Sequence, residues 1–522
     1  MQELKNFVRE NQILLLTWVT GFLLTIQVIN IHSYVALNID HQSVIAARDD
    51  DASWNVAKAV KTRWWKDNGW VLYGPAYLRL AHTMQYFWGR TAAPTVDRAE
   101  EVWERTAHHA IMTISLLSLV GTALLIATAL VVWWWQRFLL AMAFLSVFLS
   151  IDSWTEFLLR AHPDHLFTLV IVAALFLTLK MFQRPTEKIW FLLSAILWGI
   201  SVSVKMTLSV AAPGFFLLFI PPFTKENFRR GLKYLGVMFA AYFIIGFPQT
   251  IVLDRVYRAL SEIGGLSTTP NLQSLQAWLA AYGEQLWRPA LILILAWLCF
   301  DLRKNTLHKI SYFRVKAFVL LPFLVLLSKN MLVPSAHYVI PFAGMLIFFL
   351  GFHLGHLPQP WAGKYPLLRA TTFFALVLVI FGSTPQKLQA QLQVRLSCGD
   401  EARQVYKEIV KLYDAGENIW VDPYVPYITK VSKDRVDMTW DKNWEGYAKN
   451  NWTVLALQKG FRQKYIGAEV SEYTQKDTPG WRGSREFYLA LGDGDSMTTP
   501  SGHSFKRVYQ DSCGHELWQR QR

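Results

Sequence analysis

Residues 13–31 read ILLLTWVTGFLLTIQVINI, an apolar run that contains no charged residue. About 20 consecutive apolar residues, wound as an α-helix, are enough to cross the hydrocarbon core of a bilayer. A secretory signal peptide would end in a cleavage site of small residues, and none follows this run. The stretch therefore predicts an uncleaved membrane helix near the start of the chain.

Comparable apolar segments recur as far as residue 384, separated by polar or charged connections. Several are short for an average bilayer, which predicts tilted or irregular helices. Together they predict an α-helical polytopic membrane protein with about 11 transmembrane helices. The segments are 13–32, 108–133, 138–158, 165–182, 189–204, 207–222, 234–252, 289–302, 317–328, 336–356 and 370–384.

The overall composition indicates that a sizeable polar region accompanies the apolar one. The chain has 522 residues, of which 52% are hydrophobic, yet its mean hydropathy is only +0.21. Its net charge of +14 would suggest nucleic-acid binding in a soluble protein. Here the basic residues gather in short connections between apolar segments, so the positive-inside rule explains them and no nucleic-acid partner is expected.

The basic connections alternate along the chain, and this alternation predicts its orientation. Lys5 and Arg9 precede the first segment, and basic residues recur in every second connection afterwards. The N-terminus is therefore expected to be cytoplasmic, and residues 33–107 and 253–288 are expected to be external loops. An odd number of spans then places the C-terminus outside. We expect an integral protein of a bacterial inner membrane, with a periplasmic or extracellular C-terminal domain.

The composition changes near residue 386, which divides the chain into a transmembrane domain, 1–385, and a small C-terminal extramembrane α/β domain, 386–522. In the second domain a helical pattern covers 402–414, and strand-like runs occur at 418–423, 452–457, 486–491 and 507–510. Cys398 and Cys513 lie near its two ends, and either a disulfide or two free thiols fits the sequence. Cys299 lies in an apolar segment and is expected to be inert.

The first external loop contains a cluster of carboxylates, Arg48-Asp49-Asp50-Asp51, ahead of an aromatic-rich stretch. Charge beside a membrane helix is costly unless it serves chemistry or an ion. Asp50 and Asp51 are therefore candidates for a general base, since a carboxylate can take a proton from an attacking hydroxyl, or for a metal ligand. The alternative, which the cluster taken alone favours, is a solvated loop or the N-cap of a helix over 53–63, with Asp49 as the pure cap.

A second dense group, RAHPDH at 160–165, occupies the short external turn between two apolar segments. Such polar residues cannot all face lipid, so they line water, pair with one another or bind a charged group. Arg160, His162 and Asp164 are candidate substrate-binding residues. His162 and Asp164, together with Asp50, are also candidate ligands of a divalent metal, although no diagnostic metal spacing is present. The alternative is a capping cluster at the interface.

Two further groups lie at predicted external helix ends. Lys205 lies at the turn of an apolar hairpin, where its ammonium would either reach the lipid headgroups or contact a phosphate. Lys329, His337 and Tyr338 surround the start of a later segment and are candidates for donating to a phosphate or a sugar. A buried His–Tyr pair is the alternative. All of these groups map to one external face, which suits a substrate with an anionic head and a lipid tail.

In this order, the residues resemble the motifs of the GT-C superfamily of polyprenyl-phosphate-sugar-dependent glycosyltransferases, in the branch with protein O-mannosyltransferases and lipid A aminoarabinose transferases. The resemblance covers roughly residues 10–385, and a C-terminal extramembrane domain is usual in the family. Asp51 replaces the usual Glu, and His337 replaces the usual Arg. The matching stretches are Asp50-Asp51-Ala52-Ser53-Trp54, Tyr73-Gly74-Pro75-Ala76-Tyr77, Arg160 to Asp164, Val204-Lys205 and His337-Tyr338-Val339-Ile340-Pro341.

The resemblance implies a GT-C-like fold and a membrane hexosyl- or pentosyltransferase. The donor would be a polyprenyl-phosphate-linked sugar in the bilayer, and the acceptor a hydroxyl of a glycan, lipid or protein on the extracytoplasmic side. Transfer would invert the anomeric configuration, with Asp50 as general base. Lys205 would stabilise the departing phosphate, with Arg160, Lys329 and His337 as weaker candidates. No cofactor is implied with certainty, and a divalent metal stays open.

Two other classes of protein stay open. A lipid or sugar transporter or flippase also needs charge within the membrane, but such proteins usually show two related halves with interrupted helices, and no such halves are visible here. A structural or assembly protein could carry an aromatic external loop. It would not need carboxylates and cations that converge on one face.

Overall fold

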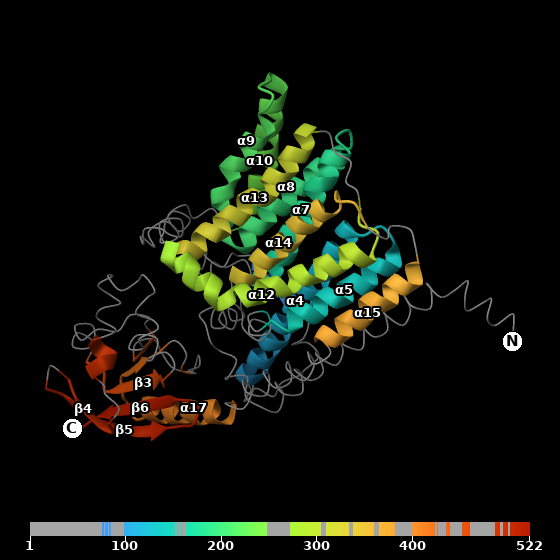
Figure 1. Ribbon diagram of the computed structural model, residues 1–522. Helices are drawn as coiled ribbons and strands as arrows, with labels where there is room; N and C mark the ends of the chain where they lie inside the picture. Colours follow the sequence, from blue (N-terminus) through green and yellow to red (C-terminus); the bar gives the residue numbers. More distant parts are fainter. Residues whose placement is uncertain are drawn as a thin grey trace.

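A computed structural model shows a helical part followed by a C-terminal part that contains a β-sheet (Figure 1). The structure describes residues 76–77, 79–81, 83–84, 99–151, 154, 158, 163–247, 272–303, 309–332, 338–359, 365–381, 399–422, 425, 435–438, 451–459, 486–490, 494–499 and 502–521. The predicted first span at 13–32 lies outside these residues.

Among the described residues, each predicted apolar segment from 108–133 onward overlaps a helix. The largest difference from the predicted segments is at 289–302, where the observed helix already begins at Leu272. The first half of this helix mixes Gln, Trp and Tyr with apolar residues, so it is too polar to be recognised as an apolar segment. Part of the predicted external loop at 253–288 is therefore helical. The helices are α4 (Ala99–Leu130), α5 (Trp134–Leu149), α7 (Asp164–Gln183), α8 (Lys188–Val204), the 3₁₀ helix η3 (Met206–Ala211), α9 (Ala212–Phe219), α10 (Lys225–Gly246), α12 (Leu272–Cys299), α13 (Lys309–Leu332), α14 (Val339–Leu354) and α15 (Pro366–Phe381).

Three of the described helices are long and apolar enough to cross a membrane, over Met112–Leu130, Asp164–Gln183 and Ser311–Ser328. Shorter apolar helices, among them α5, α8 and α14, accompany them. This composition agrees with a polytopic membrane protein, while the number of about 11 spans stays a prediction.

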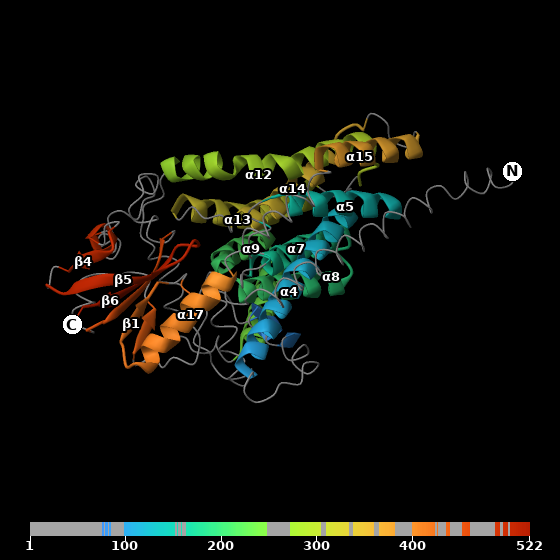
Figure 2. The same ribbon diagram turned by 90° about the horizontal axis from the view of Figure 1, so that it is seen from below.

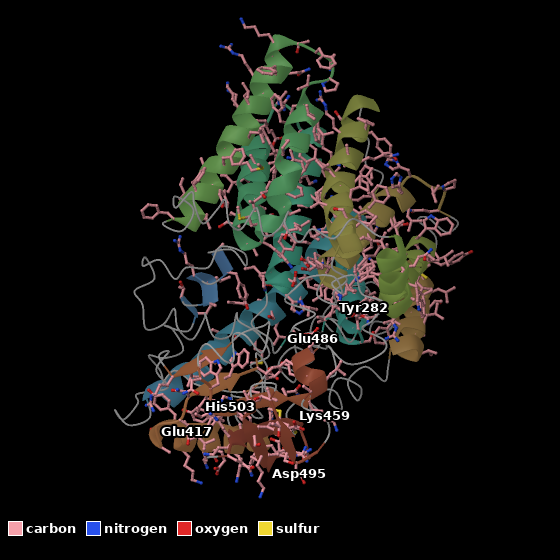
Figure 3. The ribbon with its side chains drawn as sticks, turned by 90° about the vertical axis from the view of Figure 1, so that its left-hand side faces the viewer. Tyr282, Glu417, Lys459, Glu486, Asp495 and His503 are labelled. Atoms are coloured by element: carbon pink, nitrogen blue, oxygen red, sulfur yellow. The ribbon has the colours of Figure 1, made fainter. Side chains whose placement is uncertain are left out.

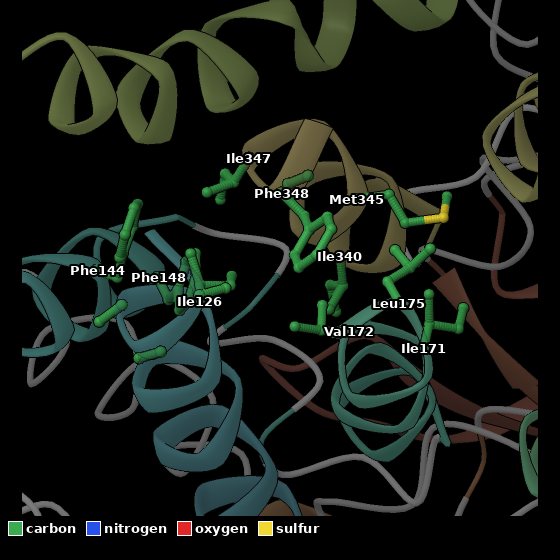
Figure 4. Packing of buried hydrophobic residues seen from close by; sticks show 14 of the residues in the cluster. Ile126, Phe144, Phe148, Ile171, Val172, Leu175, Ile340, Met345, Ile347 and Phe348 are labelled. Carbon is green, nitrogen blue, oxygen red and sulfur yellow. The ribbon is translucent and has the colours of Figure 1, made fainter. Parts of the chain in front are cut away.

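The helical part has one large core of buried apolar side chains. Figure 4 shows Ile340 and Phe348 of α14 close to Val172 of α7, with Ile126 of α4 and Phe148 of α5 beside them. Because α14 contacts both α4 and α7, it ties the start of the helical part to its middle.

Helices α8 and α10 approach each other at Gly199. A Cβ atom on Gly199 would lie 2.2 Å from the carbonyl oxygen of Met238 and 2.9 Å from the Cβ of Ala241. Small residues at helix crossings in membranes allow such close packing, which replaces the hydrophobic driving force that lipid does not supply. Glycine at 199 is therefore required by the α8–α10 contact.

Buried hydroxyl groups connect α7, α8 and α10 near this crossing. The Ser194 hydroxyl is 2.8 Å from both the Thr178 and the Tyr234 hydroxyls, and the indole N–H of Trp198 donates to Thr178 over 3.1 Å. Each of these side chains is almost completely buried. In a lipid environment such bonds satisfy polar groups that would otherwise have no partner.

The C-terminal part consists of α17 (Gly399–Asp414) and a six-stranded sheet in the order β2-β1-β3-β6-β5-β4. Strand β1 pairs in parallel with both β2 and β3, whereas β3, β6, β5 and β4 pair antiparallel. The strands are β1 (Ile419–Val421), β2 (Val436–Met438), β3 (Val454–Gln458), β4 (Ser496–Thr498), β5 (Ser504–Gln510) and β6 (His515–Arg520).

Both faces of this sheet are covered. Alternate side chains of a strand point to opposite faces, so Leu517 packs with α17 while the next residue, Trp518, packs with Phe487 and Tyr488. The prediction of a strand at 486–491 is wrong, because residues 486–490 are helical. A short apolar run has no period that separates the two structures, and burial of the adjacent Phe487 and Tyr488 decided the outcome.

The C-terminal part lies at the end of the helical part where α4 and α12 begin (Figures 1 and 2). In Figure 3, Glu486 lies on the side of the C-terminal part nearer the helices and Asp495 on the far side. Both α4 and α12 follow segments predicted to be external. The arrangement agrees with an external C-terminal domain, whose orientation in the membrane stays a prediction.

Candidate functional site

Asp164 is the first residue of α7 and is fully buried. Pro163 precedes the helix, and its carbonyl accepts a hydrogen bond from the Phe167 N–H over 2.7 Å. The Thr168 hydroxyl donates to the Asp164 carbonyl, also over 2.7 Å. A carboxylate in the first turn lies at the positive end of the helix dipole, which stabilises its charge.

Lys205 lies where α8 passes into η3. Its backbone is extended, with φ −148° and ψ 110°, between two helical segments. Its N–H still donates to Ser201 of α8, and its carbonyl accepts from Leu208 of η3. The predicted hairpin turn is thus a single extended residue. The 3₁₀ helix η3 follows it, and a 3₁₀ stretch between helical segments often marks a functional hinge or a strained sequence.

The end of α8, the start of α7 and the start of α14 bring three predicted site residues together. The Lys205 ammonium donates to Asp164 Oδ1 over 2.6 Å, and the two side chains are 4% and 0% exposed. The same ammonium is 4.5 Å from the ring centroid of Tyr338 and 5.7 Å from that of Phe167. Tyr338 is in turn hydrogen-bonded to the side chain of Thr207.

This arrangement holds a positive charge within the helical part. The carboxylate and the two aromatic faces replace the water that an isolated ammonium would need. An ammonium has three N–H donors, and Asp164 accepts one of them. Lys205 can therefore contact a second anion, such as a phosphate. Its ammonium has already lost its water before that anion arrives.

His165 of the RAHPDH group has a structural place. Its Nε2 is 3.0 Å from the carbonyl oxygen of Trp154, and the two rings meet edge to face at 5.8 Å. Trp154 also stacks on Phe148 of α5 at 3.9 Å. His165 thus links the start of α7 to Trp154, which follows α5 in the sequence.

Several predicted site residues cannot be placed. Asp50, Asp51, Arg160, His162 and His337 lie outside the described residues, and the described part of Lys329 is limited to its backbone in α13. Their predicted roles stay predictions. Among the described residues, no group of three or more His, Cys, Asp or Glu side chains could hold a metal ion.

Two arginines at the end of the helical part that contains Lys205 and Asp164 were not singled out from the sequence. Arg79, in a described helical stretch of the first loop, donates to the carbonyl of Ile245 near the end of α10, and burial lowers its pKa. Arg288 of α12 donates to the carbonyl of Ser150, which caps α5, over 2.9 Å. Cations at helix C-termini satisfy orphan carbonyls, but no local pattern marks such long-range caps.

The described residues form a multi-helix part with a buried ion pair at one end, and an α/β domain lies at that end. Solved structures share this overall fold. The solved structure of apo ArnT from Cupriavidus metallidurans aligns with a TM-score of 0.50 and 12% identity, over 96% of this chain and 98% of that chain. The fold expected from the sequence motifs is therefore confirmed.

Two further solved structures are similar. ArnT from Cupriavidus metallidurans bound to undecaprenyl phosphate has a TM-score of 0.49 and 11% identity over 96% of this chain and 98% of that one. The Archaeoglobus fulgidus oligosaccharyltransferase has a TM-score of 0.41 and 12% identity over 91% and 72%. No protein-family model and no curated protein matches the sequence.

Proposed function

We propose that the protein is a membrane glycosyltransferase that moves a sugar from a polyprenyl-phosphate donor to an acceptor hydroxyl on the extracytoplasmic side. The observation that carries the proposal is the buried contact between Lys205 and Asp164, in a protein with the GT-C fold. The motifs around Asp50, Tyr73 and Arg160 support it from the sequence.

Lys205 would stabilise the departing lipid phosphate. A phosphate that leaves during sugar transfer develops negative charge, and a cation already in place lowers the energy of that transition state. Asp164 would keep Lys205 charged and oriented before the donor arrives, and Tyr338 would exclude water from its other side. Arg160, Lys329 and His337 are further candidates for the same phosphate.

Asp50 would act as general base, with Asp51 beside it. The acceptor oxygen attacks the anomeric carbon, its proton passes to the Asp50 carboxylate, and the bond from that carbon to the phosphate oxygen breaks. Attack on the face opposite the leaving group inverts the configuration. His162, Asp164 and Asp50 would be the ligands if a divalent metal takes part.

The experiment uses purified protein in liposomes that contain a polyprenyl-phosphate sugar. Lys205→Ala should reduce apparent affinity for the donor more than for the acceptor, and Lys205→Arg should restore part of it, although a guanidinium has different geometry. Equal loss of both apparent affinities would make Lys205 a structural residue.

Mass spectrometry of a deletion strain names the donor, because one polyprenyl-linked sugar should accumulate. Movement of that lipid across the liposome membrane without any sugar transfer would instead support a transporter or flippase.

A further inference from the structure

The other end of the helical part carries a cluster of cations, Arg137 of α5, Lys180 of α7 and Arg303 after α12. Lys180 lies 16 residues after Asp164 on the same helix, which at 1.5 Å per residue is a distance of about 24 Å. The cation cluster is therefore separated from the Lys205–Asp164 pair by most of a bilayer core.

The two arginines are held in place by neighbouring backbone carbonyls. Arg303 Nε donates to Val131 over 3.1 Å, and an Arg137 guanidinium nitrogen donates to Val132 over 2.9 Å. Val131 also forms an antiparallel bridge with Leu302, which fastens the α4–α5 connection to the end of α12. Burial and the charge of Arg137 lower the pKa of Arg303.

Within the part of the chain that the structure describes, the charges that act on Lys180 are all positive. It is repelled by Arg303, Arg184 and Arg137, and its ammonium lies 5.5 Å from the ring centroid of Phe176 on its own helix. Such repulsion is unfavourable unless an anion offsets it.

The nearby carboxylates are engaged elsewhere. Asp301 accepts two bonds from Arg369 of α15, at 3.0 and 3.1 Å. Glu187 accepts from Arg184 and, over 2.6 Å, from the Trp190 indole. Among the described residues, no carboxylate forms an ion pair with any member of the cation cluster.

The surroundings of the cation cluster match a membrane interface. Trp133 lies in the connection whose Val131 and Val132 carbonyls accept the arginine bonds, and Trp134 begins α5; their side chains are 53% and 42% exposed. Tryptophan prefers the headgroup level of a bilayer, where its ring is in apolar surroundings and its N–H reaches water.

We propose that the cation cluster of Arg137, Lys180 and Arg303 is a binding site for a phosphate group, supplied by the headgroup of an anionic phospholipid. Basic pockets between membrane helices bind such headgroups, and fixed guanidinium groups suit phosphate oxygens. General attraction between basic loops and the membrane surface does not require that several cations lie at one position. Here cations from three separate elements lie together, and no carboxylate among the described residues pairs with them.

The test measures lipid binding by native mass spectrometry of the full-length protein, together with its thermal midpoint, in detergent with added phosphatidylglycerol, phosphatidylcholine or inorganic phosphate. Phosphatidylglycerol should bind and stabilise more than phosphatidylcholine. Lys180→Gln should weaken this binding about fivefold, the loss expected for one interfacial cation. Lys180 makes no backbone hydrogen bond through its side chain, so this variant keeps the fold even if Arg303→Gln does not.

Arg229→Gln is the matched control, since Arg229 is exposed near the start of α10, at the same end of the helical part. It removes the same charge outside the cation cluster and should leave binding unchanged. Equal weakening by the two variants would overturn the site, as would equal binding of the two lipids. Inorganic phosphate could raise the thermal midpoint as much as phosphatidylglycerol does, with that increase lost in Lys180→Gln. This result would assign the site to a soluble phosphate.

Discussion

Lys205 and Asp164, 41 residues apart in the sequence, form a 2.6 Å ion pair that is almost completely buried. The pair is neutral as a whole, yet each member alone would be a charge without water. Its effect on the free energy of unfolding is therefore asymmetric. Keeping both charges costs little, whereas removing one partner leaves an uncompensated charge.

Asp164→Asn should destabilise the protein by about 3–5 kcal/mol, the range for breaking a buried pair by removal of one partner. The measurement is thermal or denaturant unfolding in detergent. The double variant Asp164→Asn/Lys205→Met removes both charges and should recover most of that stability.

Stability recovered by the double variant should not bring back sugar transfer, because the cation for the phosphate is absent. Transfer at the wild-type rate by this variant would contradict a role for Lys205 in catalysis. A single variant Asp164→Asn as stable as the wild type would show that the pair is not desolvated in the membrane.

Asp50→Asn should reduce turnover on the order of a hundredfold or more, the loss expected when a general base is removed. Folding and donor binding should persist, since Asn has the shape and capping ability of Asp. Asp49→Asn is the matched control and should stay active. Asp51→Asn should be milder than Asp50→Asn, and near-normal transfer by Asp50→Asn would leave Asp51 or Asp164 as candidates.

Gly199→Ala should lower stability by at least about 1 kcal/mol, within the usual range for overpacking. The added methyl group would lie 2.2 Å from the Met238 carbonyl, which belongs to the backbone of α10 and cannot move alone. Gly236→Ala on α10 is the control, since a Cβ there meets nothing within 4 Å. That change should be neutral or slightly stabilising, because Ala favours helices over Gly. Equal midpoints for the two variants would rule out the tight crossing.

The C-terminal part should lie outside the cytoplasm. Cys513 is disulfide-bonded, whereas Cys299 is free and buried. A structural disulfide fits an exported domain. A reporter that works only in the cytoplasm, fused after Arg522, should stay silent, and peptide mapping without reductant should find Cys513 linked to Cys398. Strong reporter activity would reverse the topology.

Asp511 should make the C-terminal part sensitive to acid. Burial raises the pKa of its carboxyl, but hydrogen bonds from His515 outweigh burial and hold that pKa below its usual value. A carboxyl with a lowered folded pKa contributes stability above its unfolded pKa of about 4 and loses it as pH falls through the folded value. The stability difference between wild type and Asp511→Asn, followed by Trp fluorescence, should be constant above that pH and shrink below it. A stability difference that grows as the pH falls would mean that the folded pKa of Asp511 is raised, and it would contradict this prediction.

Much of the fold follows from local sequence. The runs at 165–182 and 189–204 predict α7 and α8 almost to the residue, because an apolar stretch in a membrane satisfies its backbone only as a helix. Outside the apolar segments the signal is weaker. The mixed composition at the start of α12 hid a helix, and 486–490 proved helical where a strand was expected.

The sequence by itself identified Asp164, Lys205 and Tyr338 as candidates and placed them at one membrane face, since the direction of each helix follows from the charges at its ends. Only the tertiary structure decided which of them touch. The packing of α7, α8 and α14 determines that Lys205 pairs with Asp164 and lies against Tyr338, while the adjacent His165 turns toward Trp154. Those contacts depend on how three helices pack across long separations in the chain, and no local pattern encodes that packing.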